Sequence, residues 1–169
     1  MMQVKGDYSA NNVLKEGKIL EIIENMRNRG NKIGLCVGAF DVLHPGHLTH
    51  LNSAKKHCDA LVIGITSDKY VSKRRSKGRP VFNEQLRAFS VSQIKAVDYV
   101  FISNYKTANE AIMQLKPDFY IKGPDYKNDF ESDIISERES IKKVGGRIVY
   151  TEDEKLSTSE IIEHIKALE

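Results

Sequence analysis

The stretch LCVGAFDVLHPGHLTHL, residues 35–51, decides how this 169-residue chain folds. Alternating apolar residues before Gly38 predict a buried strand, and the glycine itself predicts a tight turn. A helix is then expected to begin at Pro45 or Gly46, because proline favours the first position of a helix. Strand, turn and helix in this order form the unit from which parallel α/β sheets are built.

Two histidines, His44 and His47, stand where the turn meets the first turn of the predicted helix. The start of a helix leaves backbone N–H groups unpaired and carries the positive end of the helix dipole, so it favours a phosphate. Two imidazoles at the same place add hydrogen-bond donors for a multiply charged phosphate. The stretch therefore predicts a triphosphate cradle at the carboxyl end of the first strand.

Apolar segments and helical segments alternate along the remaining chain. Strands are predicted at about residues 32–37, 60–65, 98–102, 116–123 and 147–151. Helices are predicted at about residues 14–29, 45–58, 84–94, 107–115, 132–144 and 158–168. Strands separated by helices favour a parallel sheet with right-handed crossovers. The expected fold is α/β: a Rossmann-like, doubly wound, five-stranded parallel sheet with an extra N-terminal helix.

The extra helix, residues 14–29, lies before the first strand, and we expect it to form an N-terminal extension over residues 1–31. The domain itself is then expected to span residues 32–169. Four aliphatic residues cluster within about one turn of this helix: Ile19, Leu20, Ile22 and Ile23. One face can therefore cover the sheet while another contacts a second subunit, which favours a homodimer.

Composition bounds the class of protein. A formal charge of +3 is too small to indicate a broad nucleic-acid surface, and no apolar run is long enough to span a bilayer. The two cysteines, Cys36 and Cys58, occupy apolar positions and are interpreted as buried thiols in a reducing compartment. Because no apolar signal segment opens the chain, a cytoplasmic location is expected, with neither nucleic acid nor membrane as a partner.

The segment GAFDVLHPGH, residues 38–47, resembles the G-x-F-D-x-x-H-x-G-H signature of the cytidylyltransferase-like nucleotidyltransferases. These enzymes join a nucleoside triphosphate to a phosphorylated small molecule and release pyrophosphate. GRPVFNEQLR, AVDYV and YIKGPDY resemble the sugar-phosphate members, notably the domain that adenylylates heptose 1-phosphate and the combined kinase and nucleotidyltransferase lineage. Pro124 replaces the acidic residue that follows the glycine in glycerol-phosphate cytidylyltransferases, which favours ATP over CTP.

The resemblance implies roles for particular positions. The catalytic residues are expected to be His44, His47 and Lys73. The nucleotide is expected to contact Gly38, Ala39, Phe40, Gly46, Arg87, Lys122, Gly123, Asp125, Thr158 and Ser159. The triphosphate also implies a divalent cation, Mg²⁺, that keeps much of its water shell. Asp41 is interpreted as an architectural residue that holds the turn through backbone N–H groups.

Residues 67–80 are predicted to form a long basic loop, within which Lys73, Arg75 and Lys77 are expected to meet the substrate phosphate. A solvated run of charge explains the same residues nearly as well. His50 makes a zinc triad with the other two histidines conceivable, but no cysteine or carboxylate completes a metal site, so no protein-held metal is expected.

The favoured function is adenylyl transfer to a sugar phosphate, with a sugar kinase as a further domain or partner. A cytidylyltransferase acting on glycerol 3-phosphate or a similar polyol phosphate is the first alternative. A module that senses a nucleotide without turning it over is the second, although it would not need both histidines, Lys122 and Thr158. A dehydrogenase is a weaker third, because no G-x-G-x-x-G follows the first strand.

Overall fold

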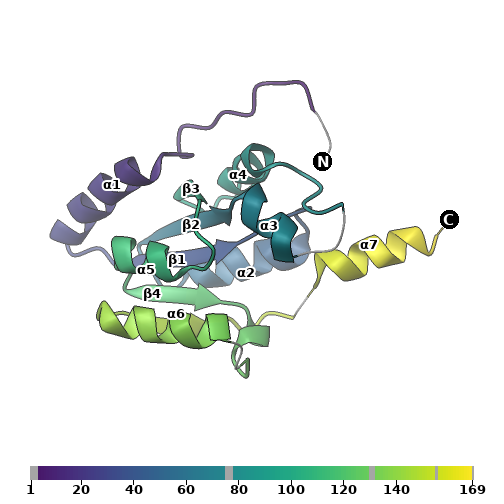
Figure 1. Ribbon diagram of the computed structural model, residues 1–169. Coiled ribbons are helices and arrows are strands. Elements are labelled where there is room, and N and C mark those ends of the chain that lie inside the picture. The colour runs from purple at the N-terminus through teal and green to yellow at the C-terminus, as the bar shows by residue number, and fades with distance from the viewer. Residues whose placement is uncertain (1–3, 75–77, 130–131, 155, 169) are drawn as a thin grey trace.

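Five parallel strands form one sheet in the order β3-β2-β1-β4-β5 (Figure 1). The computed structural model describes residues 4–74, 78–129, 132–154 and 156–168. The strands are β1 (Ile33–Gly38), β2 (Ala60–Thr66), β3 (Tyr99–Ser103), β4 (Phe119–Lys122) and β5 (Arg147–Tyr150). The predicted five-stranded parallel sheet is thus confirmed.

The order of the strands reverses between β1 and β4. The chain passes from β1 outward through β2 to β3, then returns to the other side of β1 to add β4 and β5. Connections that leave neighbouring strands in opposite directions open a crevice beyond their carboxyl ends, where α/β proteins bind ligands. The segment after Gly38 and the segment after Lys122 flank this crevice.

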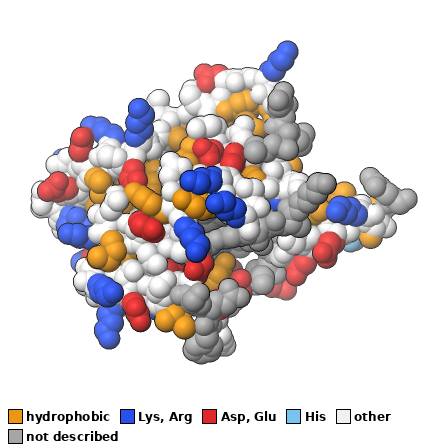
Figure 2. Space-filling view, in the orientation of Figure 1, with side chains coloured by type: hydrophobic (Ala, Val, Ile, Leu, Met, Phe, Trp, Pro, Cys, Tyr) orange, Lys and Arg blue, Asp and Glu red, His pale blue; other side chains and the backbone are white. Residues whose placement is uncertain are grey.

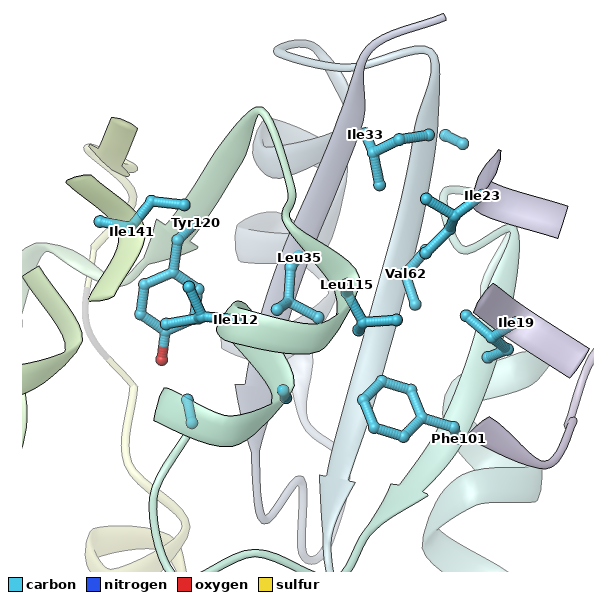
Figure 3. Packing of buried hydrophobic residues seen from close by; sticks show 13 residues of the cluster. Ile19, Ile23, Ile33, Leu35, Val62, Phe101, Ile112, Leu115, Tyr120 and Ile141 are labelled. Atoms are coloured by element: carbon cyan, nitrogen blue, oxygen red, sulfur yellow. The ribbon is translucent and has the colours of Figure 1, made fainter. Parts of the chain in front are cut away.

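Helices cover both faces of the sheet. One face packs against α1 (Glu16–Asn28), α5 (Asn109–Leu115) and α6 (Ser132–Lys143) (Figure 3). The other packs against α2 (Pro45–Lys55) and α4 (Glu84–Ser92). Because both faces are covered, the central strands need apolar side chains on both sides, and Ala60 to Ile65 contain no polar side chain.

The N-terminal helix packs on the sheet within the same chain. Ile19 and Ile23 are almost fully buried and join the cluster that contains Phe101 of β3 (Figure 3). Just before α1, Val13 makes a parallel bridge to Val100 at the edge of β3. The N-terminal segment therefore extends the sheet and contributes to its core, whereas the homodimer stays a prediction.

The prediction of a loop over residues 67–80 is wrong for its first half, which forms the short helix α3 (Asp68–Arg74). The backbone N–H groups of Tyr70 and Val71 both donate to the carbonyl of Ser67, and the Val71 side chain is buried. The buried Val71 side chain thus packs α3 against the rest of the domain. Because basic residues surround Val71, the sequence of this helix resembles that of a charged loop.

Two predicted helix starts are confirmed. The side chain of Asn83 accepts a hydrogen bond of 2.9 Å from Leu86 N at the start of α4. Ser157 and Glu160 form a capping box at the start of α7 (Thr158–Lys166). In Figure 1, α7 extends away from the sheet, and its residue Ile165 is 55% exposed.

Figure 2 shows Lys and Arg side chains interspersed with Asp and Glu on the visible face. Among the described residues of this face there is therefore no extended patch of one sign, of the kind that nucleic-acid binding needs. Among the helices of the described ranges, none is both long and apolar enough for a bilayer crossing.

The packing of α1 predicts that replacing Ile23 destabilises the whole domain. Ile23→Ala removes a buried side chain and leaves a cavity, so we expect it to lower the free energy of unfolding by about 2–5 kcal/mol. Urea denaturation measures this loss. Ile165→Ala, at the exposed position of α7, is the matched control and should change it by less than about 0.5 kcal/mol. Equal effects of the two substitutions would show that α1 is not part of the core.

Candidate functional site

The turn after β1 is held in a strained conformation by one buried carboxylate. Phe40 and Val42 have φ values of 48° and 51°, in the left-handed region that side chains other than glycine rarely adopt. Between them lies the Asp41 carboxylate, which accepts hydrogen bonds from the backbone N–H groups of Val81 and Phe82. This confirms the architectural interpretation of Asp41.

Arg79 completes the coordination of this carboxylate through a contact of 2.7 Å from its Nε atom to Asp41 Oδ2. The side chain of Asp41 is only 1% exposed. A buried charge requires such partners, since desolvation would otherwise favour its neutral form. The segment before α4 is thereby tied to the motif turn.

His44 and His47 lie against each other at the start of α2, with their ring centroids 3.8 Å apart and their planes 28° from parallel. The buried Nδ1 atoms of both rings have no hydrogen-bond partner among the described residues. Burial lowers the pKa of His44. Burial and the neighbouring His44 and His50 lower the pKa of His47 to about 4. Both rings are therefore neutral at pH 7.

Gly46 lets a second segment approach this pair. A Cβ atom at position 46 would lie 2.9 Å from Leu156 Cβ and 3.1 Å from two atoms of the His44 ring. Leu156 directly precedes α7, so the absence of a side chain at Gly46 brings the start of α7 against the start of α2. The hydroxyl of Thr158 secures this contact by donating to the Asp41 carbonyl at 2.9 Å.

The starts of α2 and α7 therefore face one cavity of about 370 Å³. The first turn of α2 contains no acidic side chain, so nothing on that turn competes with a bound anion. Across the cavity lie Lys122 and Gly123 at the carboxyl end of β4. The cavity occupies the crevice where the strand order reverses.

The structure brings together most of the residues that were expected to contact the nucleotide. The cavity is lined by His44, His47, Gly38, Ala39, Phe40, Gly46, Lys122, Gly123, Asp125, Thr158 and Ser159. They come from three separate stretches of the chain, residues 38–47, 122–125 and 158–159. Their convergence places the motif turn, the end of β4 and the start of α7 around a single volume.

Arg87 does not line this cavity. Its side chain is fully buried and donates to the carbonyl groups of Ala39, Phe82 and Thr66. It also forms an ion pair of 2.8 Å with Asp68. Arg87 thus joins the motif turn, the end of β2 and the start of α3, and its expected contact with the nucleotide stays a prediction.

The basic segment is placed only in part. Lys73 lies on α3, is exposed, and lines neither this cavity nor the smaller one that adjoins it. Arg75 and Lys77, the other residues expected at the substrate phosphate, lie outside the described residues. Arg79, from the same segment, lines the cavity, and its Nε atom contacts Asp41.

Several residues that line the cavity were not predicted from the sequence as site residues: His50, Arg79, Thr151, Asp153 and Glu154. His50 Nδ1 lies 3.0 Å from the hydroxyl of Thr151, and Ser53 donates to Asp153 at 2.9 Å. A signal was available for the last three, because they directly follow a strand end at the same edge of the sheet. In the described part of the chain, no group of three His, Cys, Asp or Glu side chains has the arrangement of a metal site.

A second cavity, of about 220 Å³, adjoins the first. Its lining includes Tyr105, Thr107, Asp133 and Glu137, which lie beyond the ends of β3 and β4. Residues 37–39, Lys122 and Tyr126 line both cavities and so form the wall between them. The site is therefore divided into two compartments.

Comparison with known proteins gives a family match over most of the chain. The family model described as "Cytidylyltransferase-like" matches residues 35–164. The bifunctional protein HldE of Hyphomonas neptunium is 38% identical over 150 residues, which cover 88% of this chain. The HldE protein of Wolinella succinogenes is 34% identical over 160 residues, or 94% of this chain. The chain spans only 30% and 32% of the length of these two relatives.

A solved structure supports the same relationship. The crystal structure of the lipopolysaccharide core biosynthesis protein from Thermoplasma volcanium GSS1 superimposes with a TM-score of 0.63 and 26% sequence identity. The match covers 75% of this chain and all of that protein.

The lowered pKa of His47 predicts a pH dependence of stability. Unfolded His47 has a pKa near its ordinary value of 6.5, above the folded value of about 4, so the unfolded chain binds more protons between these values. The stabilisation is present above pH 6.5 and is lost as the pH falls toward 4. His47→Asn should therefore flatten the dependence of the unfolding free energy on pH by up to about 1.4 kcal/mol per pH unit.

Urea denaturation at several pH values between 4.5 and 7.5 measures this slope. His57→Asn is the matched control because His57 is exposed at the end of α2, and it should leave the slope unchanged. Equal slopes for wild type and His47→Asn would contradict the neutral, buried state of this ring.

Proposed function

We propose that this chain, which belongs to the cytidylyltransferase-like family, transfers an adenylyl group from ATP to the phosphate of a sugar phosphate. One observation carries the proposal. The stacked pair of His44 and His47 lies at the start of α2 and shares its cavity with the start of α7. Two helix starts and two imidazoles around one volume suit a polyphosphate.

In this reaction an oxygen of the acceptor phosphate attacks the α-phosphorus of ATP. The bond from the α-phosphorus to the bridging oxygen breaks, and the electron pair leaves with pyrophosphate. The reaction needs no covalent nucleophile, since both substrates only have to be aligned while negative charge moves onto the leaving group. His44 and His47, as neutral rings, each have one N–H to donate to that charge.

The sugar-phosphate acceptor is supported by sequence similarity. The segments around Val81, Tyr99 and Lys122 resemble sugar-phosphate members of the family, and relatives named HldE align with 88% and 94% of this chain. Because those relatives are described as bifunctional and are about three times longer, a sugar kinase is proposed as a further domain or partner. Pro124, after Gly123, supports ATP as the donor.

Mg²⁺ is proposed to accompany the triphosphate. The carboxylates of Asp125, Asp153 and Glu154 line the cavity, and carboxylate oxygens are ligands that suit this hard cation. One or two of them would complete a shell made mainly of phosphate oxygens and water. Bound there, the ion would neutralise charge on the pyrophosphate.

The active form is proposed to be a homodimer.

The first prediction of this proposal is turnover. Purified protein with Mg²⁺, ATP or CTP, and a panel of sugar and polyol phosphates should release pyrophosphate, fastest with ATP and a sugar 1-phosphate. A coupled phosphate-release assay with inorganic pyrophosphatase measures it. Faster turnover with CTP and glycerol 3-phosphate would favour the cytidylyltransferase instead. Binding of triphosphate without turnover of any acceptor would identify a nucleotide sensor.

The second prediction concerns His47. If its N–H stabilises the transition state, His47→Ala should lower kcat by about a hundredfold while the affinity for ATP changes much less. Steady-state kinetics and calorimetric titration separate the two quantities. A loss of the thermal unfolding transition in this variant would instead identify His47 as a residue that the fold requires.

A further inference from the structure

Lys122 occupies the wall between the two cavities. Of the described residues that line both, it is the one that carries a charge. Its ammonium lies 3.9 Å from the centroid of the Tyr126 ring, a cation–π contact, and its side chain is only 11% exposed. A cation in this wall can reach ligands on both sides. Lysine has four rotatable side-chain bonds, so a defined position requires something to hold the ammonium.

Glu137 of α6 supplies that hold. Its Oε2 atom lies 3.1 Å from Lys122 Nζ and accepts a hydrogen bond of 3.0 Å from the Tyr120 hydroxyl. Its Oε1 atom accepts a hydrogen bond of 3.3 Å from Ala108 N. The carboxylate is thus fixed from β4 and from the residue that precedes α5. The fixed carboxylate in turn holds the flexible side chain of Lys122.

Stability alone does not account for this pair. The side chain of Glu137 is 8% exposed, so both charges are largely desolvated. The attraction within a buried ion pair roughly offsets the cost of desolvating its members, and an apolar pair of similar volume is often as stable. A nearly buried ion pair in the wall of a site therefore indicates a need for a charge at a defined position.

We propose that Glu137 is a positioning residue that holds the Lys122 ammonium between the two cavities, where it contacts both the donor triphosphate and the acceptor phosphate. This inference rests on the proposed function, because it assigns the two cavities to the two substrates. In the free protein the carboxylate neutralises the lysine. When two anionic substrates enter, the lysine reduces their mutual repulsion at the point where the new bond forms.

A double-mutant cycle on kcat tests this role. Glu137→Gln keeps the size of the side chain and one acceptor oxygen, which can accept from Tyr120 or from Ala108, but it removes the charge that holds the lysine. We expect it to lower kcat about tenfold, with the dissociation constant of ATP changed less than about threefold. Lys122→Met should lower kcat by at least as much. In the Lys122→Met background, Glu137→Gln should lower kcat less than about twofold further.

Glu139→Gln is the matched control, since Glu139 is an exposed residue of the same helix, and it should leave kcat unchanged. An equal tenfold loss from Glu137→Gln in both backgrounds would overturn the proposal, because Glu137 would then act through the fold and not through Lys122. Wild-type kinetics in Glu137→Gln would overturn it as well. A failure of the proposed function is distinguishable, because the wild-type protein would then release no pyrophosphate.

Chemical labelling of Lys122 tests the contact with Glu137 without any need for turnover. Limited reaction with an amine-reactive reagent, followed by mass spectrometry, measures how far Lys122 is protected. Glu137→Gln should increase the labelling rate of Lys122 several-fold relative to Lys95. Lys95 precedes the edge strand β3, and β1 and β2 separate that strand from β4, which carries Lys122. An unchanged ratio would show that Glu137 does not hold the lysine.

Discussion

The site depends on the buried carboxylate of Asp41. The carboxylate accepts hydrogen bonds from the backbone of residues 81 and 82 and from Arg79. The backbone carbonyl of Asp41 accepts a hydrogen bond from the hydroxyl of Thr158. These contacts connect the motif turn to the segment before α4 and to the start of α7. Left-handed backbone at two residues other than glycine costs about 1–3 kcal/mol at each, and the turn persists because its surroundings over-determine it. The carboxylate thus fixes the turn whose backbone carbonyl receives the start of α7.

In this cavity the groups that can attract an anion are chiefly dipoles. His44 and His47 are neutral, and Arg79 is already paired with Asp41, so the free site contains few uncompensated positive charges. Lys122 is likewise neutralised by Glu137. Backbone N–H groups and imidazoles oriented before the ligand arrives need little reorganisation during reaction, which is how preorganised sites stabilise developing charge. Because the buried charges of the site are paired with one another, the domain folds without a bound ligand to neutralise them.

The order of strands and helices could be predicted because their apolar periodicity is local. The motif turn, both caps and the convergence on one sheet edge follow from residues close together in sequence. Arg87 could not be assigned in this way. Its partners are carbonyl groups of three separate segments, and nothing in the local sequence distinguishes such an arginine from one that faces a ligand.

Glu137 and Val71 were missed for a related reason. Each stands among charged residues, so its local sequence resembles a solvated surface, yet both side chains are buried. Burial of an isolated residue is decided by packing between distant elements. Here β4 and Ala108 surround the carboxylate, while the body of the domain covers Val71 on α3. The family resemblance also placed Lys73 at the site, although in this structure its helix leaves it exposed.

A crystal structure with an ATP analogue that cannot be cleaved between its α- and β-phosphates would show whether the starts of α2 and α7 bind the triphosphate together. We expect phosphate oxygens within about 3 Å of the ring nitrogens of His44 and His47 and of the backbone N–H groups at Thr158 and Ser159. We also expect Asp41 to keep its contacts with the backbone at residues 81 and 82. Phosphates bound elsewhere, with both histidines left without a phosphate contact, would contradict this triphosphate site.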